Sequence, residues 1–430
     1  MSRSYDAIII GAGIIGTATA LALSRSGRRV LVCDKNPAAG YGSTSASSAI
    51  IRTFYSSRAG CALAWEGLQI WRQWRQFLGA GPDETLAGFR PCPALLPLDG
   101  DSGVEAILSH HDALAIPYRR LDAEELKQGW PMLDLTRYGP PRRPEDEDFG
   151  QPSGGELTGA VLFPESGYVD DPQLAARNMQ HAAERLGAHF RFGCVVTGIL
   201  RSGGGAAGVE LADGTQISAP VVVNAAGPYS SRINQLAGAL EDMNLATRAL
   251  RQEVCHLPAL TGFAGQVIMC DADIGCYWRT EPSGALLVGG MEPDCDPLEW
   301  VDDPDQWERN PSEQWTAQAY RAGLRLPSLG IPNQAGGVAE LYDVSDDWTP
   351  IYDISALPGF FMAVGTSGNQ FKNGPIAGEL MAALIDWQAG GHDHDREPCR
   401  LNLTRSGGTL DLAAFSRRRK PVSGAGNVLG

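Results

Sequence analysis

Positive charge, paired cysteines and long apolar runs are all scarce in this sequence. The chain has 35 Lys and Arg against 50 Asp and Glu, a net charge of −15 at pH 7, which argues against a nucleic-acid partner or an anionic membrane surface. The nine cysteines form no Cys-x-x-Cys pair, so we expect reduced thiols in a cytoplasmic protein, without disulfides or a metal site. Glycines interrupt the longest uncharged run, 7–24, so no membrane span is expected.

The first 34 residues carry the pattern around which the rest is organised. Two short apolar strands, 7–10 and 30–33, flank a helical stretch. Between the first strand and the helix stands G-x-G-x-x-G, and the second strand ends in an acid; these residues are Gly11, Gly13, Gly16 and Asp34. The glycines permit a tight turn, a close approach of a pyrophosphate and close helix packing, and the acid suits a ribose diol. We predict a dinucleotide site; the alternative is an ordinary glycine-rich turn.

The 430 residues, 43% of them hydrophobic, leave room for two or three domains. The order of apolar patterns predicts an α/β fold, α+β overall, in which two discontinuous domains alternate. The nucleotide-binding domain is expected in residues 1–81, 159–240 and 337–395, and a second domain in residues 82–158 and 241–336. Consecutive strands with turns between them predict an antiparallel sheet in the second domain.

Several segments receive local predictions. Single strands are expected over 190–200 and 217–223. The polar, Pro- and Gly-rich stretch 138–156 is expected to be a flexible surface insertion. The tail 396–430 carries a basic patch, 417–420, which we expect to be solvated.

Five motifs occur in a fixed order: GAGIIG with its acid, GSTSASSAIIR, GYVDDP, VVVNAAGPYS and GTSGNQFKNGP. Because it carries this set of motifs, the chain resembles the D-amino-acid oxidase/glycine oxidase (DAO) superfamily of FAD enzymes, in particular its sarcosine oxidase-like branch. The resemblance covers about residues 5–387, except 138–156. It implies a Rossmann-like FAD-binding domain with a parallel sheet and a discontinuous substrate domain with an antiparallel sheet.

The resemblance also implies which residues bind an extended FAD. They are Gly11, Gly13, Ile14, Ile15, Gly16, Asp34 and Lys35 at the ADP end; Ser43, Thr44, Ser45, Ala46, Ser47 and Ser48 near the flavin; Val195 and Val196 by the adenine; Ala225, Ala226, Gly227 and Tyr229 on the diphosphate side; and Gly365, Gly368, Asn369, Gln370, Phe371 and Lys372 by the pyrimidine edge. A helix starting near Pro375 would direct its positive end at that edge.

Two cations match the positions that hold a substrate carboxylate in monomeric sarcosine oxidases: Arg52 in IIR and Lys372 in GNQFK. A guanidinium fork and a point cation suit a carboxylate in a closed pocket. The alternatives are a structural salt bridge for Arg52 and a surface amine for Lys372. Tyr277, counted with the catalytic residues, and Trp278 are candidate pocket walls, or ordinary sheet packing.

The implied reaction is oxidation of an amino acid or N-alkyl amino acid, a sarcosine-like amine next to a carboxylate, by hydride transfer to flavin N5. The imine then hydrolyses. One alternative is an FAD-dependent dehydrogenase of a 2-hydroxy acid or glycerol 3-phosphate. Another is a non-catalytic FAD-binding subunit of a larger complex.

Three positions depart from the monomeric sarcosine oxidase pattern. Ala49 replaces a second basic residue, an apolar residue near Leu287 replaces the oxygen-activating Lys, and Glu340 replaces the Cys that tethers the flavin. The departures imply non-covalent FAD and leave O₂ or another electron acceptor open. The oligomeric state stays open too.

Overall fold

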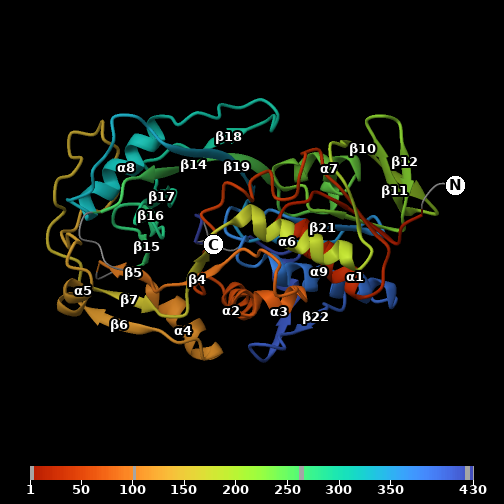
Figure 1. The fold of residues 1–430 in the computed structure, drawn as a ribbon, viewed down its shortest axis with the longest axis horizontal. Helices are drawn as coiled ribbons and strands as arrows, with labels where there is room; N and C mark the ends of the chain where they lie inside the picture. Colours follow the sequence, from red (N-terminus) through yellow and green to blue (C-terminus); the bar gives the residue numbers. More distant parts are fainter. Residues whose placement is uncertain (1–3, 100–102, 261–265, 422–426, 430) are drawn as a thin grey trace.

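The computed structural model describes residues 4–99, 103–260, 266–421 and 427–429 (Figure 1). It is a mixed α/β fold with one mainly parallel and one mainly antiparallel sheet, which confirms the predicted class. Among the described helices, none combines the length and the apolar content needed to cross a bilayer.

Six described strands form the mainly parallel sheet, in the order β20-β21-β13-β1-β2-β9. Only the edge strand β20 runs antiparallel to its neighbour. The strands are β1 (Ala7–Ile10), β2 (Val30–Cys33), β9 (His189–Arg191), β13 (Val221–Asn224), β20 (Ile351–Ile354) and β21 (Phe360–Val364). β1 and β2 are buried along their whole length, as central strands of a parallel sheet are.

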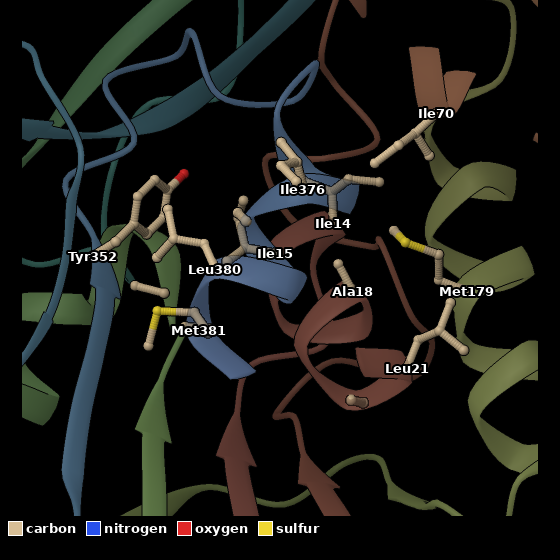
Figure 2. Packing of buried hydrophobic residues seen from close by; sticks show 14 of the residues in the cluster. Ile14, Ile15, Ala18, Leu21, Ile70, Met179, Tyr352, Ile376, Leu380 and Met381 are labelled. Atoms are coloured by element: carbon tan, nitrogen blue, oxygen red, sulfur yellow. The ribbon is translucent and has the colours of Figure 1, made fainter. Parts of the chain in front are cut away.

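Helices from distant parts of the chain pack on one another; α1, α6 and α9 contact this sheet, and α2 packs on α9. They are α1 (Ile14–Arg25), α2 (Arg58–Arg72), α6 (Pro172–Arg185) and α9 (Gly374–Ala389). Asp171 caps α6 by accepting from the Leu174 N–H, as Asp-Pro at a helix start predicts. Figure 2 shows α1 side chains packed toward Ile376 of α9 and Met179 of α6. This packing fixes the start of α1 relative to the start of α9.

Nine described strands form the larger sheet, on the opposite side of the molecule in Figure 1. Its neighbours are antiparallel except β5 and β15. The strands are β5 (Ala94–Leu98), β6 (Arg119–Asp122), β7 (Gly159–Phe163), β14 (Thr247–Leu257), β15 (Ile268–Asp271), β16 (Cys276–Thr280), β17 (Leu286–Gly290), β18 (Glu299–Val301) and β19 (Gly337–Ser345), and helix α8 (Glu313–Arg325) packs on them. The antiparallel character of the second domain matches the prediction.

Shorter elements complete the fold. They are the strands β3 (Ile50–Ile51), β4 (Phe89–Pro91), β8 (Gly167–Val169), β10 (Val196–Ser202), β11 (Gly205–Leu211), β12 (Gln216–Ser218), β22 (Arg400–Asn402) and β23 (Thr409–Asp411), the helices α3 (Trp74–Leu78), α4 (Val104–Leu114), α5 (Ala123–Gly129) and α7 (Ser230–Leu236), and the 3₁₀ turns η1 (Gly227–Tyr229), η2 (Leu240–Asp242) and η3 (Leu412–Phe415).

Two predicted strands are wrong because each is two strands in different sheets. Residues 190–200 contain the end of β9 and the start of β10, separated by a turn in which Gly193 has a φ of +65°. Residues 217–223 contain parts of β12 and β13, with Pro220 between them. A left-handed glycine and a proline without an N–H both interrupt a strand ladder.

The domain boundaries predicted at 159 and 337 also need correction. β7 pairs with β5 and β6, and β19 pairs with β14 over nine positions, so both strands belong to the larger sheet. The chain therefore returns to the six-stranded sheet only after β7 and after β19. β19 is followed directly by β20, so the chain passes here from the larger sheet to the six-stranded sheet.

The basic patch 417–420 is only partly solvated: Arg418 and Lys420 are exposed, as predicted, whereas Arg417 is buried. The Arg417 guanidinium is 2% exposed and forms ion pairs with Asp242, Asp353 and Asp395. Its three carboxylate partners compensate the cost of burying the charge.

In the insertion 138–156, the amide N–H groups of Tyr138 and Gly139 donate to Asp273. The flexibility of this insertion stays a prediction.

Candidate functional site

The turn from β1 to α1 requires two of its three glycines for steric reasons. Gly11 has a φ of +106°, and a Cβ there would lie 2.3 Å from the Ala225 carbonyl oxygen. A Cβ on Gly16 would lie 1.9 Å from the Gly11 carbonyl oxygen. The turn therefore brings α1, β1 and the end of β13 closer together than any other residue type allows.

The start of α1 faces a cavity. Gly13 is the N-cap and supplies no side-chain capping bond, and the Ile14 N–H donates to Thr44 Oγ1 at 3.1 Å. Asp34 accepts from the Ala12 N–H at 2.6 Å and from the Asn36 N–H at 2.7 Å, while burial raises the pKa of its carboxyl group. The positive end of the helix and an ordered carboxylate thus border one cavity, as a diphosphate and a ribose require.

Three adjoining cavities run from this turn into the interface of the two sheets. Their volumes are about 880, 120 and 40 Å³. The first and second share Gly13, Thr44 and Gly227 in their walls, and the second and third share Ser48 and Gly368. An elongated path lined by small residues fits an extended dinucleotide.

Most of the predicted site residues lie on this path. Those that line it are Gly11, Gly13, Ile14, Ile15, Asp34, Lys35, Ser43, Thr44, Ala46, Ser47, Ser48, Arg52, Val195, Val196, Ala225, Ala226, Gly227, Tyr229, Tyr277, Gly368, Asn369, Gln370, Phe371 and Lys372. Gly16, Ser45 and Gly365 are not among the lining residues. The Ser45 hydroxyl donates back to Gly42, and the Gly365 N–H donates to Asp343 Oδ2 at 2.7 Å.

The innermost cavity contains both predicted cations. Arg52 and Lys372 are each 4% exposed. The Tyr55 ring lies 4.4 Å from the Arg52 guanidinium carbon, and its hydroxyl accepts from Lys372 Nζ at 3.1 Å. Lys372 Nζ also donates to the Asn369 carbonyl at 2.7 Å. Burial and the nearby Arg52 charge lower the pKa of Lys372 well below its usual value.

Neither cation forms an ion pair with an acid in residues 4–99, 103–260, 266–421 or 427–429. The Arg52 guanidinium donates to the carbonyls of Phe54 and Val428, and the Lys372 ammonium donates to the Asn369 carbonyl and the Tyr55 hydroxyl. The alternatives of a structural salt bridge and a surface amine therefore do not describe these residues. Buried positive charge without an anionic partner favours binding of an anion.

β16 divides its two aromatic residues between opposite faces. The Tyr277 hydroxyl accepts from Ser48 Oγ at 3.3 Å and lines the innermost cavity. Trp278 belongs instead to the hydrophobic cluster under α8. Successive residues of a strand point to opposite faces, so only one of the two candidate pocket walls lies at the site.

The sequence analysis missed several cavity residues. Asp343 lines the middle cavity, accepts from Ser230 Oγ at 2.7 Å, and has its pKa raised to about 7 by burial. Tyr342 and Val428 line the innermost cavity. The adjacent tyrosine and acid, Tyr342 and Asp343 of β19, were the available signal for the first two; Val428, in the tail, gave none.

Comparison with known proteins places the site in a family. The profile of the DAO family, described as FAD dependent oxidoreductase, matches residues 6–384. Sarcosine oxidase subunit beta of Rhodobacter capsulatus is 23% identical over 89% of this chain and 85% of its own length.

Two solved structures share the fold. L-proline dehydrogenase from P. horikoshii superposes with a TM-score of 0.75 at 21% identity, over 97% of this chain and 98% of that one. L-alpha-glycerophosphate oxidase from Mycoplasma pneumoniae, with FAD bound, has a TM-score of 0.72 at 17% identity, over 90% and 95%. At these identities the likeness concerns the fold.

Proposed function

This chain belongs to the DAO family of FAD-dependent oxidoreductases, and we propose that it oxidises an amino acid or N-alkyl amino acid at the carbon that carries the amine. FAD is its cofactor, and when bound it accepts the hydride at flavin N5. The glycine turn and Thr44 would hold the ADP half, and Ser47, Ser48 and Gly368 would border the flavin. The imine that results hydrolyses in water.

The observation that carries this proposal is the pair of buried cations beside the flavin end of the cavity. Arg52, directly after β3, and Lys372, in the loop before α9, line the same small space, and both lie close to the Tyr55 ring. A substrate carboxylate would supply the missing negative charge and fix the adjacent amine-bearing carbon. Orientation and electrostatics of this kind supply much of the rate enhancement in an enzyme without a strong base.

An anaerobic substrate screen tests the proposal. Loss of the visible absorbance of the bound flavin on adding primary, N-methyl or cyclic amino acids is the expected result. Reduction by glycerol 3-phosphate or a 2-hydroxy acid alone would favour the dehydrogenase of a hydroxyl group. No reduction by any of the three classes would favour a non-catalytic FAD-binding subunit.

We further propose an electron acceptor other than O₂. The family's oxygen-activating lysine is replaced by an apolar residue near Leu287, and Leu287 is a buried residue of β17. Without a cation at that position, negative charge developing on oxygen lacks stabilisation. Reoxidation of the reduced flavin should therefore be slow in air and fast with a quinone; fast reoxidation by air would contradict this.

A further inference from the structure

Two residues of the tail, Val428 and Leu429, line the innermost cavity, and Val428 forms backbone hydrogen bonds to Arg52 and to Glu292. Val428 is 8% exposed and lines the same space as Arg52 and Lys372. Its carbonyl oxygen accepts from Arg52 Nη2 at 2.8 Å, and its N–H donates to Glu292 Oε2 at 2.8 Å. The tail thus supplies an acceptor to the buried cation and a donor to a buried acid.

The two contacts come from the two ends of one amino-acid unit. The nitrogen and the carbonyl carbon of Val428 are bonded to the same Cα, as are the amine and the carboxyl group of a free α-amino acid. Arg52 therefore binds at the position of the carboxyl end and Glu292 at the position of the amine end. Longer amino acids, with an additional carbon between the two groups, do not have this spacing.

The surroundings of Glu292 suit a carboxylate that binds a positively charged group. Its Oε1 accepts from Gln252 Nε2 of β14 at 3.1 Å. Burial raises the pKa of its carboxyl group to about 8, the nearby negative charge of Asp296 adds to this rise, and the Val428 N–H opposes it. Tyr277 of β16 and Tyr342 of β19 lie near enough to feel its charge. In the described part of the chain no cation forms an ion pair with Glu292.

We propose that Glu292 and Arg52 recognise the amine and the carboxyl group of an α-amino acid, and that Val428 occupies their site as an internal pseudosubstrate. The proposal rests on the proposed function and narrows its substrate class. An incoming ammonium group would donate to Glu292 Oε2 in place of the Val428 N–H. When the Glu292 carboxyl group is ionised, one proton then passes from the nitrogen to this oxygen, which leaves the neutral amine that hydride loss from Cα requires.

The side chain of the pseudosubstrate indicates the side chain of the substrate. Val428 belongs to the same apolar cluster as Phe54, Tyr277 and Met291. An aliphatic α-amino acid would bury the same kind of surface when it displaces Val428. Its apparent affinity is lowered by the fraction of molecules in which the tail occupies the site.

Binding to the FAD-loaded protein tests the proposal without relying on turnover. The probes are L-valine and 3-methylbutanoate, which is the same molecule without the amine, measured by calorimetry. A chain ending at Lys420 should bind both probes about tenfold more tightly than the full chain, because the competing segment is gone. If the shortened chain does not fold, V428P takes its place in the test. This variant lacks the backbone N–H that donates to Glu292, and it should also bind both probes about tenfold more tightly than the full chain. V428A keeps both backbone groups and serves as the matched control.

Glu292→Gln separates the two halves of the site. In the chain ending at Lys420, E292Q should weaken the binding of L-valine by about tenfold or more. The affinity for 3-methylbutanoate should stay within about twofold, because only the amine has lost its charged partner. Equal affinities in the full and shortened chains, or equal effects of E292Q on both probes, would overturn the proposal. A different outcome would contradict the proposed function alone: L-valine binds as expected, but no amino acid reduces the flavin.

Discussion

At the scale of single residues, two buried cations line the innermost cavity, and neither pairs with an acid among the residues that the structure describes. Arg52 is held by carbonyl oxygens and Lys372 by a carbonyl and the Tyr55 hydroxyl. Carbonyl dipoles orient the two side chains but leave their net charge uncompensated. Each cation makes a separate prediction, because guanidinium keeps its charge at every accessible pH and a buried ammonium does not.

Arg52→Ala should weaken carboxylate-bearing substrates while FAD stays bound. Loss of a charge-assisted pair in a buried site costs about 2–4 kcal/mol, roughly 30- to 700-fold in kcat/KM. Steady-state kinetics and the flavin content of the purified variant measure the two effects. Arg120→Ala, at an exposed ion pair with Glu105, is the matched control and should change little. Unchanged kinetics in R52A would rule out its proposed role.

Lys372 predicts a pH dependence of carboxylate binding. Its pKa is lowered, so the ammonium form is lost as the pH rises through a value below the usual value of about 10.4. Because only the ammonium form attracts a carboxylate, the affinity for 3-methylbutanoate should fall across that range. In Lys372→Met the affinity should be weak, and this fall with pH should disappear. A fall of the same size in K372M would assign the pH dependence to another group.

At the scale of elements, the crossing of α1 and α9 sets the distance between the glycine turn, from β1 to α1, and the loop that carries Lys372. Gly378 of α9 is the contact point, where an added Cβ would lie 2.4 Å from the backbone carbonyl carbon of Ala18. Figure 2 shows the apolar side chains that surround this crossing. A change here would shift the start of α1 relative to the loop before α9, and both line the cavity.

Gly378→Ala should therefore lower the free energy of unfolding by about 1–3 kcal/mol, although alanine has the higher helix propensity by about 1 kcal/mol. Chemical denaturation measures it. Gly330→Ala is the control, since a Cβ there has no atom within 4 Å, and it should stay within about 0.5 kcal/mol of the unsubstituted protein. A G378A protein as stable as G330A would show that the helices separate without cost.

At the scale of the whole molecule, the cavity exists because two sheets meet. The parallel sheet supplies the glycine turn, and β16 and β19 of the larger sheet supply Tyr277, Glu340 and Tyr342. Glu340 lines the cavity where a tethering cysteine is implied by the resemblance, and burial raises the pKa of its carboxyl group. A carboxylic acid forms no thioether to the flavin.

Acid precipitation of the whole protein tests the attachment of the cofactor. With Glu340 in place of the cysteine, trichloroacetic acid should release all the flavin to the supernatant. A yellow pellet would show a covalent bond and overturn the prediction. The Glu340→Cys variant offers a comparison, since it restores the thiol at that position.

The sequence by itself determined the strand–turn–helix at the start, the helix capped by Asp171 and the antiparallel character of the second domain. These features depend on residues close together in the chain, where periodicity, caps and glycine spacing act directly. The types of the residues at the site could also be predicted, because a cation for a carboxylate or a glycine for a phosphate is a chemical requirement that short motifs express.

Only the tertiary structure decided what those residues meet. It placed β7 and β19 in the larger sheet, buried Arg417 among three carboxylates, and gave Arg52 and Lys372 none from the described residues. It also brought Val428 between Arg52 and Glu292. Such contacts join residues that are not neighbours in the chain, from 22 residues apart for Arg417 and Asp395 to 376 for Arg52 and Val428. Their energies come from burial and charge pairing that no local pattern records.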